Sequence, residues 1–441
     1  MRMYDVIAKK RAGGELTREE IAFFLRGYVD GKIPDYQASA LLMAICLCGM
    51  TPRETADLTL LMADSGEKMD LSSLEGVKAD KHSTGGVGDK TTLVVAPLVA
   101  SFGIRVPKMS GRGLGYTGGT IDKLESIPGL RTNLSRAEFL DILRSVGTAV
   151  ASQSDDLVPA DRKLYALRDV TATVDSIPLI ASSILSKKIA AGADRLLLDV
   201  KAGSGAFMKT RESAVRLAET MVEIGWRAGI RTEALVTNMD SPLGRAVGNS
   251  LEVTEACETL RGGGPPDVRK ICLELSAGML RLAGYGDLSS CRKAAEEHLD
   301  RGDAWEKFRE MVRAQGGDTS VLEDPSGFPQ AKIIRKVLSP SDGFLGTISA
   351  GKCGKTAVLL GAGREEKGGS PDPSAGLILL RKPGDRVHRG DPVAEFHTSD
   401  EKRFRPAEEV FLSGLSIREK APEPEPLLLY RVTRGGAEKL F

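Results

Sequence analysis

Short β-type runs alternate with helical stretches between residues 77 and 236, and this alternation most restricts the folds open to the chain. The runs are rich in branched apolar residues, whereas the stretches between them have helical periodicity. Such alternation predicts an α/β domain with a substantially parallel sheet, because parallel strands need long crossover connections. The β-type runs are 77–80, 104–109, 196–200 and 233–236, and the helical stretches are 91–101, 136–145 and 213–228.

The first 65 residues indicate helices instead. Thr17 with Glu20 and Thr51 with Glu54 have the spacing of capping boxes, and Pro52 occupies the favoured first helical position. Two further helical patterns interrupt the α/β alternation and resemble these N-terminal helices. We therefore expect a discontinuous small all-helical domain and a larger α/β domain with a mainly parallel or mixed sheet. The helical domain would comprise residues 1–65 and 161–191, and the α/β domain residues 70–160 and 192–330.

The last hundred residues differ again. Residues 332–349 and 376–396 have the pattern of short strands separated by Gly, Pro and Asp turns. The stretch 382–394 resembles one half of a biotinyl or lipoyl carrier barrel, but no lysine lies where such carriers expose their acceptor. A non-catalytic carrier is thus a weak alternative, and we expect a β-rich C-terminal module over 331–441 that resembles a barrel-sandwich hybrid.

Charge and apolar patterning exclude several partners. The chain has 61 basic and 60 acidic residues, and no basic run is long enough to line a nucleic-acid groove. The longest apolar stretches, such as 38–47, are too short to span a bilayer, and charged residues interrupt the start where a signal peptide needs an apolar core. Six cysteines without a CxxC pair suit a reducing compartment. We expect a cytoplasmic protein that binds neither nucleic acid nor membrane.

Two glycine-rich clusters follow β-type runs in the α/β part, at 81–92 and 110–120. Glycine lets a backbone approach a ligand closely, and a helix that begins just afterwards directs free N–H groups at it. Each cluster alone is explained by tight turns and helix caps, but two in consecutive strand–helix units favour an anion site. Hydroxyls and one ammonium would complete a phosphate cradle: Ser83, Thr92, Ser110, Thr120 and Lys81.

Two familiar nucleotide fingerprints nearly match these clusters. Residues 84–91 resemble a Walker loop, but Thr84 and Asp89 replace its two required glycines. Residues 113–118 match GxGxxG, yet Glu138, twenty residues further on, belongs with Ser135 to a helix-capping box rather than to the end of a strand. A phosphate-loop nucleotide hydrolase and an NAD oxidoreductase therefore remain minor alternatives.

Residues 110–125, SGRGLGYTGGTIDKLE, closely resemble the signature of the thymidine and pyrimidine-nucleoside phosphorylases. Residues 81–89 resemble the phosphate loop of that family, and 165–174 and 182–188 resemble its base-binding helices. The resemblance extends in order over nearly the whole chain. It implies an active-site cleft between the two domains, a homodimer through the helical domain, and no organic cofactor. The implied reaction is reversible phosphorolysis of uridine, thymidine and deoxyuridine, with inorganic phosphate as co-substrate.

The same resemblance implies the roles of individual residues. His82 matches a histidine placed against the base carbonyl and is a candidate proton donor; with Arg168 and Lys187 it forms the expected catalytic set. The expected phosphate ligands are Lys81, His82, Ser83, Thr92, Lys108, Met109, Ser110 and Thr120. The expected contacts to base and sugar are Leu114, Tyr116, Arg168, Ser183 and Lys187.

Three positions bear on specificity and on metal binding. Tyr116 stands where many relatives have histidine, so no acid–base role is expected there. Lys108 matches the branch that accepts uridine as well as thymidine, which favours a broad enzyme over a thymidine-specific one. Lys90 replaces a usual threonine. Its side chain could turn outward and leave its carbonyl free for a potassium ion, but we expect its ammonium to take the place of that ion because like charges would otherwise lie close. The potassium positions implied by the resemblance are Gly88, Lys90, Leu243, Ala246 and Glu255.

Overall fold

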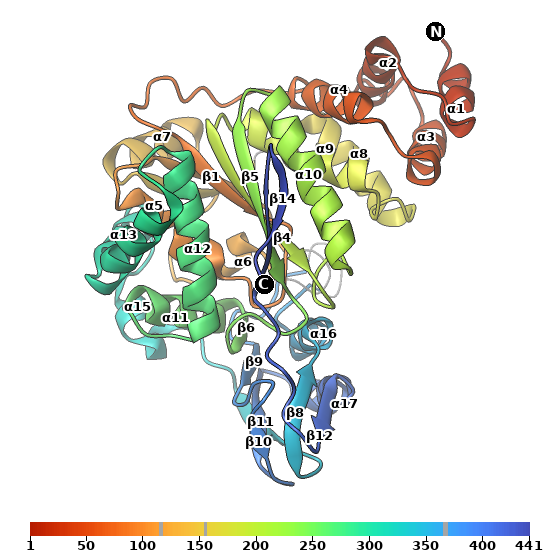
Figure 1. Cartoon of the computed structure of the whole chain (residues 1–441). Coiled ribbons are helices and arrows are strands. Elements are labelled where there is room, and N and C mark those ends of the chain that lie inside the picture. Colours follow the sequence, from red (N-terminus) through yellow and green to blue (C-terminus); the bar gives the residue numbers. More distant parts are fainter. Residues whose placement is uncertain (114–117, 154–156, 365–368) are drawn as a thin grey trace.

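The computed structural model describes residues 1–113, 118–153, 157–364 and 369–441. The N-terminal helices form a group of their own at one end of the molecule (Figure 1). The predicted capping boxes are confirmed, because Thr17 accepts a hydrogen bond from the Glu20 N–H and Thr51 accepts one from the Glu54 N–H. These helices are α1 (Met3–Arg11), α2 (Arg18–Val29), α3 (Asp35–Cys48) and α4 (Pro52–Ala63).

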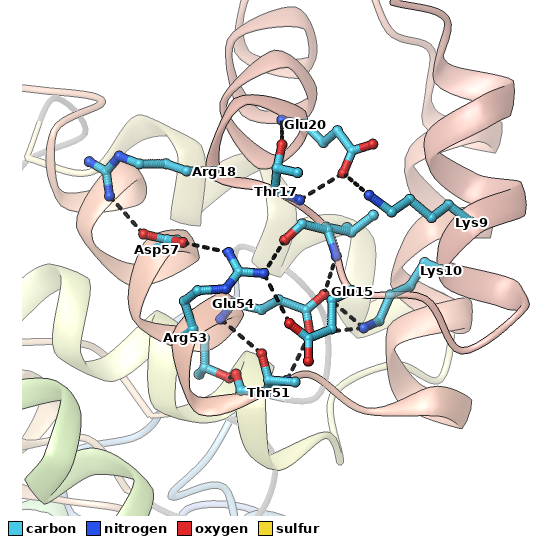
Figure 2. A network of polar contacts seen from close by, with 12 residues as sticks. Lys9, Lys10, Glu15, Thr17, Arg18, Glu20, Thr51, Arg53, Glu54 and Asp57 are labelled. Atoms are coloured by element: carbon cyan, nitrogen blue, oxygen red, sulfur yellow. Dashed lines mark hydrogen bonds and ion pairs between the residues drawn. The ribbon is translucent and has the colours of Figure 1, made fainter.

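A buried carboxylate joins three of these helices (Figure 2). Glu54, in the first turn of α4, accepts hydrogen bonds from the Lys10 ammonium of α1 at 2.8 and 3.1 Å. It also accepts from the Leu16 N–H at 2.8 Å, just before α2, and from the Thr51 N–H at 2.7 Å. Both charged side chains are buried, so this pair ties the N-terminal helices together from inside.

Two later helices, α8 (Pro159–Val170) and α9 (Ile177–Ala190), pack against the N-terminal group. α9 lies against α4, and α8 lies against α2 and α3. This packing agrees with a discontinuous helical unit, although the exact domain boundaries stay a prediction. α9 also packs on α10 (Arg211–Arg227) and thereby joins the helical part to the α/β part.

The α/β part is built on parallel strands. β1 (Ala79–Ser83), β4 (Arg195–Ala202) and β5 (Arg231–Asn238) pair in that order. β2 (Val106–Ser110) pairs in parallel with β3 (Thr148–Ser152) and lies beside β1. The four predicted runs thus all contain strands, shifted by up to three residues, whereas β3 was not predicted.

Helices cover both faces of the main sheet (Figure 1). α10 packs on one face of β4 and β5, and α12 packs on the other. α5 is buried along its whole length, which fits its uniformly apolar sequence. The further helices of this part are α5 (Thr91–Ala100), α6 (Thr120–Leu124), α7 (Arg136–Ser145), α11 (Asn249–Leu260), α12 (Pro266–Leu282), α13 (Leu288–Asp300), α14 (Asp303–Ala314) and α15 (Ser320–Glu323).

The C-terminal module contains two small antiparallel sheets, ordered β10-β8-β12 and β6-β9-β11-β7. Its second sheet includes β6 (Ala246–Gly248), which belongs to the α/β part, so strand pairing joins the two parts. The module's own elements are β7 (Ile333–Leu338), β8 (Gly343–Ile348), α16 (Ala350–Leu360), β9 (Gly376–Leu379), β10 (Arg386–Val387), β11 (Pro392–Thr398), α17 (Phe404–Leu412) and β12 (Leu415–Arg418).

The end of the chain leaves this module and returns to the main sheet. β13 (Leu428–Thr433) pairs antiparallel with β5, and β14 (Gly436–Lys439) pairs antiparallel with β13. The main sheet is therefore mixed, in the order β1-β4-β5-β13-β14. The predicted module over 331–441 includes this last segment, which in the structure pairs with a strand almost 200 residues earlier.

Candidate active site

A cavity of about 590 Å³ lies between the strand ends of the α/β part and helices α8 and α9. It brings together two groups of residues that are far apart in the sequence. The α/β part contributes His82, Ser83, Asp89, Thr92, Lys108, Ser110 and Thr120. Helices α8 and α9 contribute Asp161, Tyr165, Arg168, Ser183 and Lys187.

The hydroxyl groups on the α/β side come from strand ends and helix starts. Ser83 is the last residue of β1 and Ser110 the last of β2, and these neighbouring strands end at the same edge. Thr92 lies in the first turn of α5, whose free N–H groups and positive dipole end attract an anion. Thr120 begins α6. This side of the cavity is therefore suited to an anion such as phosphate.

Two expected phosphate ligands have side chains outside the cavity lining. The Lys81 ammonium donates to the Thr91 hydroxyl at 2.6 Å and lies 3.6 Å from the Asp199 carboxylate. The Met109 carbonyl accepts a hydrogen bond from the Lys188 ammonium at 3.0 Å. A role for either residue in binding phosphate stays a prediction.

Lys108 lines the cavity from a buried position on β2. Its ammonium donates to the Lys81 carbonyl at 2.5 Å and lies 3.6 Å from Asp80. Burial lowers the pKa of Lys108 to about 7; Asp80 opposes that shift, while the nearby Lys188 and Lys81 add to it. The charge on this side of the cavity therefore changes close to neutral pH.

This pKa predicts that anion binding weakens as the pH rises above neutrality. Binding an anion favours the charged form of Lys108, so above a pKa of about 7 the complex must take up a proton. Sulfate is the suitable probe because it remains a dianion across this range. We expect its affinity, measured by isothermal titration calorimetry, to fall by up to about tenfold per pH unit above pH 7. Lys108→Met should remove this dependence, and a wild-type affinity that does not change from pH 7 to 8.5 would contradict it.

His82 also lines the cavity. Burial holds the pKa of His82 well below its usual value of 6.5, and the positive charges of Lys188 and Lys108 lower it further. The imidazole is therefore neutral at neutral pH. A neutral ring still donates one hydrogen bond, so the predicted donor role would be carried by its N–H rather than by an imidazolium.

Arg168 is buried and holds the turn between α8 and α9. Its guanidinium donates to the carbonyls of Thr173 at 3.1 Å, Val174 at 2.9 Å and Leu179 at 3.2 Å. A guanidinium has five N–H donors, so these bonds leave two for a ligand in the cavity that Arg168 also lines.

Lys187 and Ser183 lie one turn apart on α9, as their spacing predicted. The Lys187 ammonium donates to the Ser183 hydroxyl at 3.0 Å and to the Asp161 carboxylate at 2.6 Å. Both side chains line the cavity opposite the anion-binding side. The expected base-binding residues Arg168, Ser183 and Lys187 thus meet at one wall, whereas Leu114 and Tyr116 lie outside the described residues.

Three carboxylates of the cavity, Asp89, Asp161 and Asp169, were not among the predicted site residues. Asp89 accepts hydrogen bonds from the hydroxyls of Ser83 and Thr91, and nearby lysines hold its pKa well below the usual range although burial acts in the opposite direction. Asp161 could have been found by its spacing, because it lies four residues before Tyr165 and seven before Arg168 on one face of α8.

The C-terminal module also reaches the second glycine-rich segment. The Asp122 carboxylate accepts a hydrogen bond from the Gly113 N–H at 2.6 Å, and Gly113 lines the cavity. Arg364, which follows α16, forms an ion pair with the same carboxylate at 2.5 Å. The module therefore stabilises, through Asp122, the segment at Gly113 that lines one border of the cavity.

The positions expected to bind potassium are occupied by a lysine side chain. The Lys90 ammonium donates to the carbonyls of Leu243 and Ala246, each at 3.0 Å, and to the Glu255 carboxylate. Gly88 completes this group with a φ of 73°, and a Cβ there would lie 2.4 Å from the Leu243 carbonyl oxygen. These are the residues that the resemblance assigned to the metal.

Potassium does not fit these residues as they stand. All three N–H donors of the Lys90 ammonium have acceptors, and burial leaves no room beside it. Although burial alone would lower the pKa of Lys90, Glu255 and Glu252 raise it, so the side chain is charged. A second cation against this ammonium would be repelled.

Comparisons with known proteins define the class. The α/β domain of a glycosyl transferase family matches residues 75–305, and the helical bundle domain of that family matches residues 4–66. The fold is also similar to anthranilate phosphoribosyltransferase from Thermus thermophilus, with a TM-score of 0.59 and 20% sequence identity over 70% of this chain and 99% of that one. The chain thus has the helical bundle domain and the α/β domain of a glycosyl transferase family.

Closer relatives define the family within that class. The pyrimidine nucleoside phosphorylase C-terminal domain matches residues 344–418. The chain is 54% identical to a pyrimidine-nucleoside phosphorylase of Bacillus subtilis and 53% identical to one of Geobacillus stearothermophilus, in each case over 91% of this chain and 93% of the relative. The chain belongs to the pyrimidine-nucleoside phosphorylase family.

Proposed function

We propose that the protein catalyses the reversible phosphorolysis of pyrimidine nucleosides to free base and ribose or deoxyribose 1-phosphate. Inorganic phosphate is the co-substrate, and no organic cofactor takes part. One observation carries this proposal. A single cavity has an anion-binding wall, formed by strand ends and helix starts, opposite a wall that presents Arg168 and Lys187.

The geometry suits the charges that develop in this reaction. As the bond between sugar and base breaks, positive charge builds on the sugar and negative charge on the departing pyrimidine. A phosphate oxygen forms the new bond to the anomeric carbon, and the base leaves with the electron pair of the old bond. In this proposal Lys187, Arg168 and the N–H of His82 stabilise the charge on the base. Contacts of this kind accelerate the reaction because they strengthen in the transition state.

The proposal is tested by following release of free base from uridine, thymidine and deoxyuridine by ultraviolet absorbance. Release that depends on added phosphate is the expected result. Release without phosphate would indicate a hydrolase and overturn the proposal. We propose a broad specificity that includes uridine, supported by Lys108; activity confined to thymidine and deoxyuridine would favour the thymidine-specific alternative.

We propose that the enzyme needs no potassium because the Lys90 ammonium supplies the positive charge. Wild-type activity is expected to be equal in sodium and potassium buffers. Lys90→Thr removes the ammonium and leaves Glu255 without its partner, so this variant should regain stability from potassium. We expect potassium, but not sodium, to raise the melting temperature of Lys90→Thr by about 2 °C or more and to leave the wild type unchanged. Wild-type activity that rises sharply with potassium would contradict the proposal.

We propose a homodimer that forms through the helical domain. Four uncharged residues spaced along α3 form one exposed stripe, in which Tyr36 is 73% and Leu47 is 80% exposed. Apolar surface of this kind is typical of an interface. The stripe comprises Tyr36, Ala40, Met43 and Leu47, and Tyr4 of α1 is exposed on the neighbouring helix.

Leu47→Glu is expected to convert the dimer into a monomer in light scattering. The reason is that a carboxylate at this position would have to be buried in the interface without a partner. Folding should be unaffected because Leu47 has no role in the core of the protomer. Lys32→Glu, at another exposed position of this domain, is the matched control and should stay dimeric. A wild-type protein that is monomeric at micromolar concentration would rule out the dimer.

A cytoplasmic location stays a prediction, supported by six free cysteines. Within the described part of the chain, no helix is long and apolar enough to cross a membrane.

A further inference from the structure

Asp161 is buried in the first turn of α8, and one of its carboxylate oxygens accepts a hydrogen bond from the Lys187 ammonium. Its side chain is 6% exposed, and the Oδ2–Nζ distance is 2.6 Å. Asp161 also lines the cavity. The two helices that carry the base-binding residues are thus connected by an ion pair at the wall of the cavity.

The ion pair determines how many donors Lys187 has left for a ligand. An ammonium has three N–H groups. One donates to Asp161 and a second to the Ser183 hydroxyl at 3.0 Å. One N–H therefore remains, and its direction is set by the other two because the three groups are tetrahedral. The bonds to Asp161 and Ser183 thus leave the Lys187 ammonium with one free N–H that has a fixed direction.

The same carboxylate faces Arg168. Burial lowers the pKa of Arg168, and the negative charge of Asp161 is the largest influence in the opposite direction. The Oδ1 atom of Asp161 is buried and has no hydrogen-bond partner among the described residues. An unpaired carboxylate oxygen is costly to bury unless cations lie nearby, and the two cations of the base-binding wall fulfil that condition.

We propose that Asp161 is a positioning residue, which holds the Lys187 ammonium against Ser183 so that one N–H points at the pyrimidine. This inference rests on the proposed role of Lys187 in phosphorolysis. Asp161 itself transfers no proton and forms no covalent bond. Its effect on the reaction passes through Lys187.

A double-mutant cycle of Asp161→Asn and Lys187→Ala tests this dependence. Asparagine keeps the shape of Asp161 but removes the charge that orients the ammonium. We expect Asp161→Asn to lower kcat/KM for uridine by about 10- to 100-fold, because a misplaced catalytic group has effects of this size, with the KM for phosphate nearly unchanged. In the Lys187→Ala background the same substitution should cause no further loss.

Asp141→Asn, at an exposed carboxylate of α7 paired with Arg144, is the control and should keep full activity. The inference would be overturned if Asp161→Asn caused an equal loss in the wild-type and Lys187→Ala backgrounds, or if it kept normal activity while the wild-type enzyme is active. Either result would leave the proposed function intact. A wild type without phosphate-dependent release would instead refute the proposed function. If Asp161→Asn is unstable, Asp161→Glu provides the second test: it keeps the charge, and smaller losses than in Asp161→Asn are expected.

Discussion

Lys187→Ala is expected to lower kcat/KM for uridine phosphorolysis at least ~100-fold, which corresponds to about 2.7 kcal/mol of transition-state stabilisation. The ammonium that is removed faces the cavity opposite the anion-binding wall. The next lysine along α9 cannot replace it there, because Lys188 donates to Asp80 and the Met109 carbonyl instead. Steady-state rates at saturating phosphate, followed by ultraviolet absorbance, measure the effect.

The control is Lys68→Ala, an exposed lysine paired with Asp64 outside the cavity, which should keep wild-type activity. Arg168→Ala should cause a loss at least as large as Lys187→Ala. It should also lower the melting temperature, because the carbonyls of the α8–α9 turn lose their donors. Near-wild-type phosphorolysis in Lys187→Ala would remove Lys187 from the mechanism, and the same result for Arg168→Ala would remove Arg168.

Glu54→Gln is expected to destabilise the protein by about 3–5 kcal/mol, the cost of leaving one partner of a buried ion pair without the other. Lys10 would keep its charge in the interior, and the new amide would direct an NH₂ group at donors rather than at acceptors. Chemical denaturation monitored by circular dichroism measures the change. Asp57→Asn is the control: this carboxylate pairs with Arg18 and Arg53 near the surface, so its loss should cost under about 1 kcal/mol.

The same ion pair predicts how stability depends on pH. Burial would raise the pKa of Glu54, but hydrogen bonds from Lys10 and from the Leu16 N–H outweigh burial and lower it. A lowered carboxyl pKa contributes stability that is fully present above the unfolded value of about 4.3 and is lost as the pH falls through the folded value. Wild-type stability should therefore decline below about pH 4.3, and Glu54→Gln should show a smaller decline. Equal pH profiles for the two proteins would show that Glu54 does not contribute.

Local sequence patterns predicted most of the fold because most elements here are defined by short-range chemistry. The Thr17 and Thr51 capping boxes mark where helices begin, and the apolar runs mark the parallel strands. β3 was missed because its five residues, TAVAS, carry little apolar patterning. The pairing of β13 with β5 was missed because it depends on a contact between distant parts of the chain.

The residues of the site could be predicted where they belong to a recognisable sequence motif. The glycine clusters indicated an anion site, and the resemblance supplied Arg168, Ser183 and Lys187, which the structure brings to one wall of the cavity. Asp161 belongs to no motif, and its partner lies 26 residues away on another helix. The position of the Lys90 ammonium was expected from the resemblance together with its charge, and the folded chain shows its hydrogen bonds to Leu243, Ala246 and Glu255.

The return of β13 to the main sheet affects how the protein can be made and shortened. During synthesis the edge of β5 stays open until residues 428–433 have left the ribosome, because β13 follows β5 by almost 200 residues. Deletion of residues 428–441 would expose that edge to pairing with other molecules. A shortened enzyme should therefore lose the β-rich module by an internal deletion that keeps β13 and connects it directly to the α/β part.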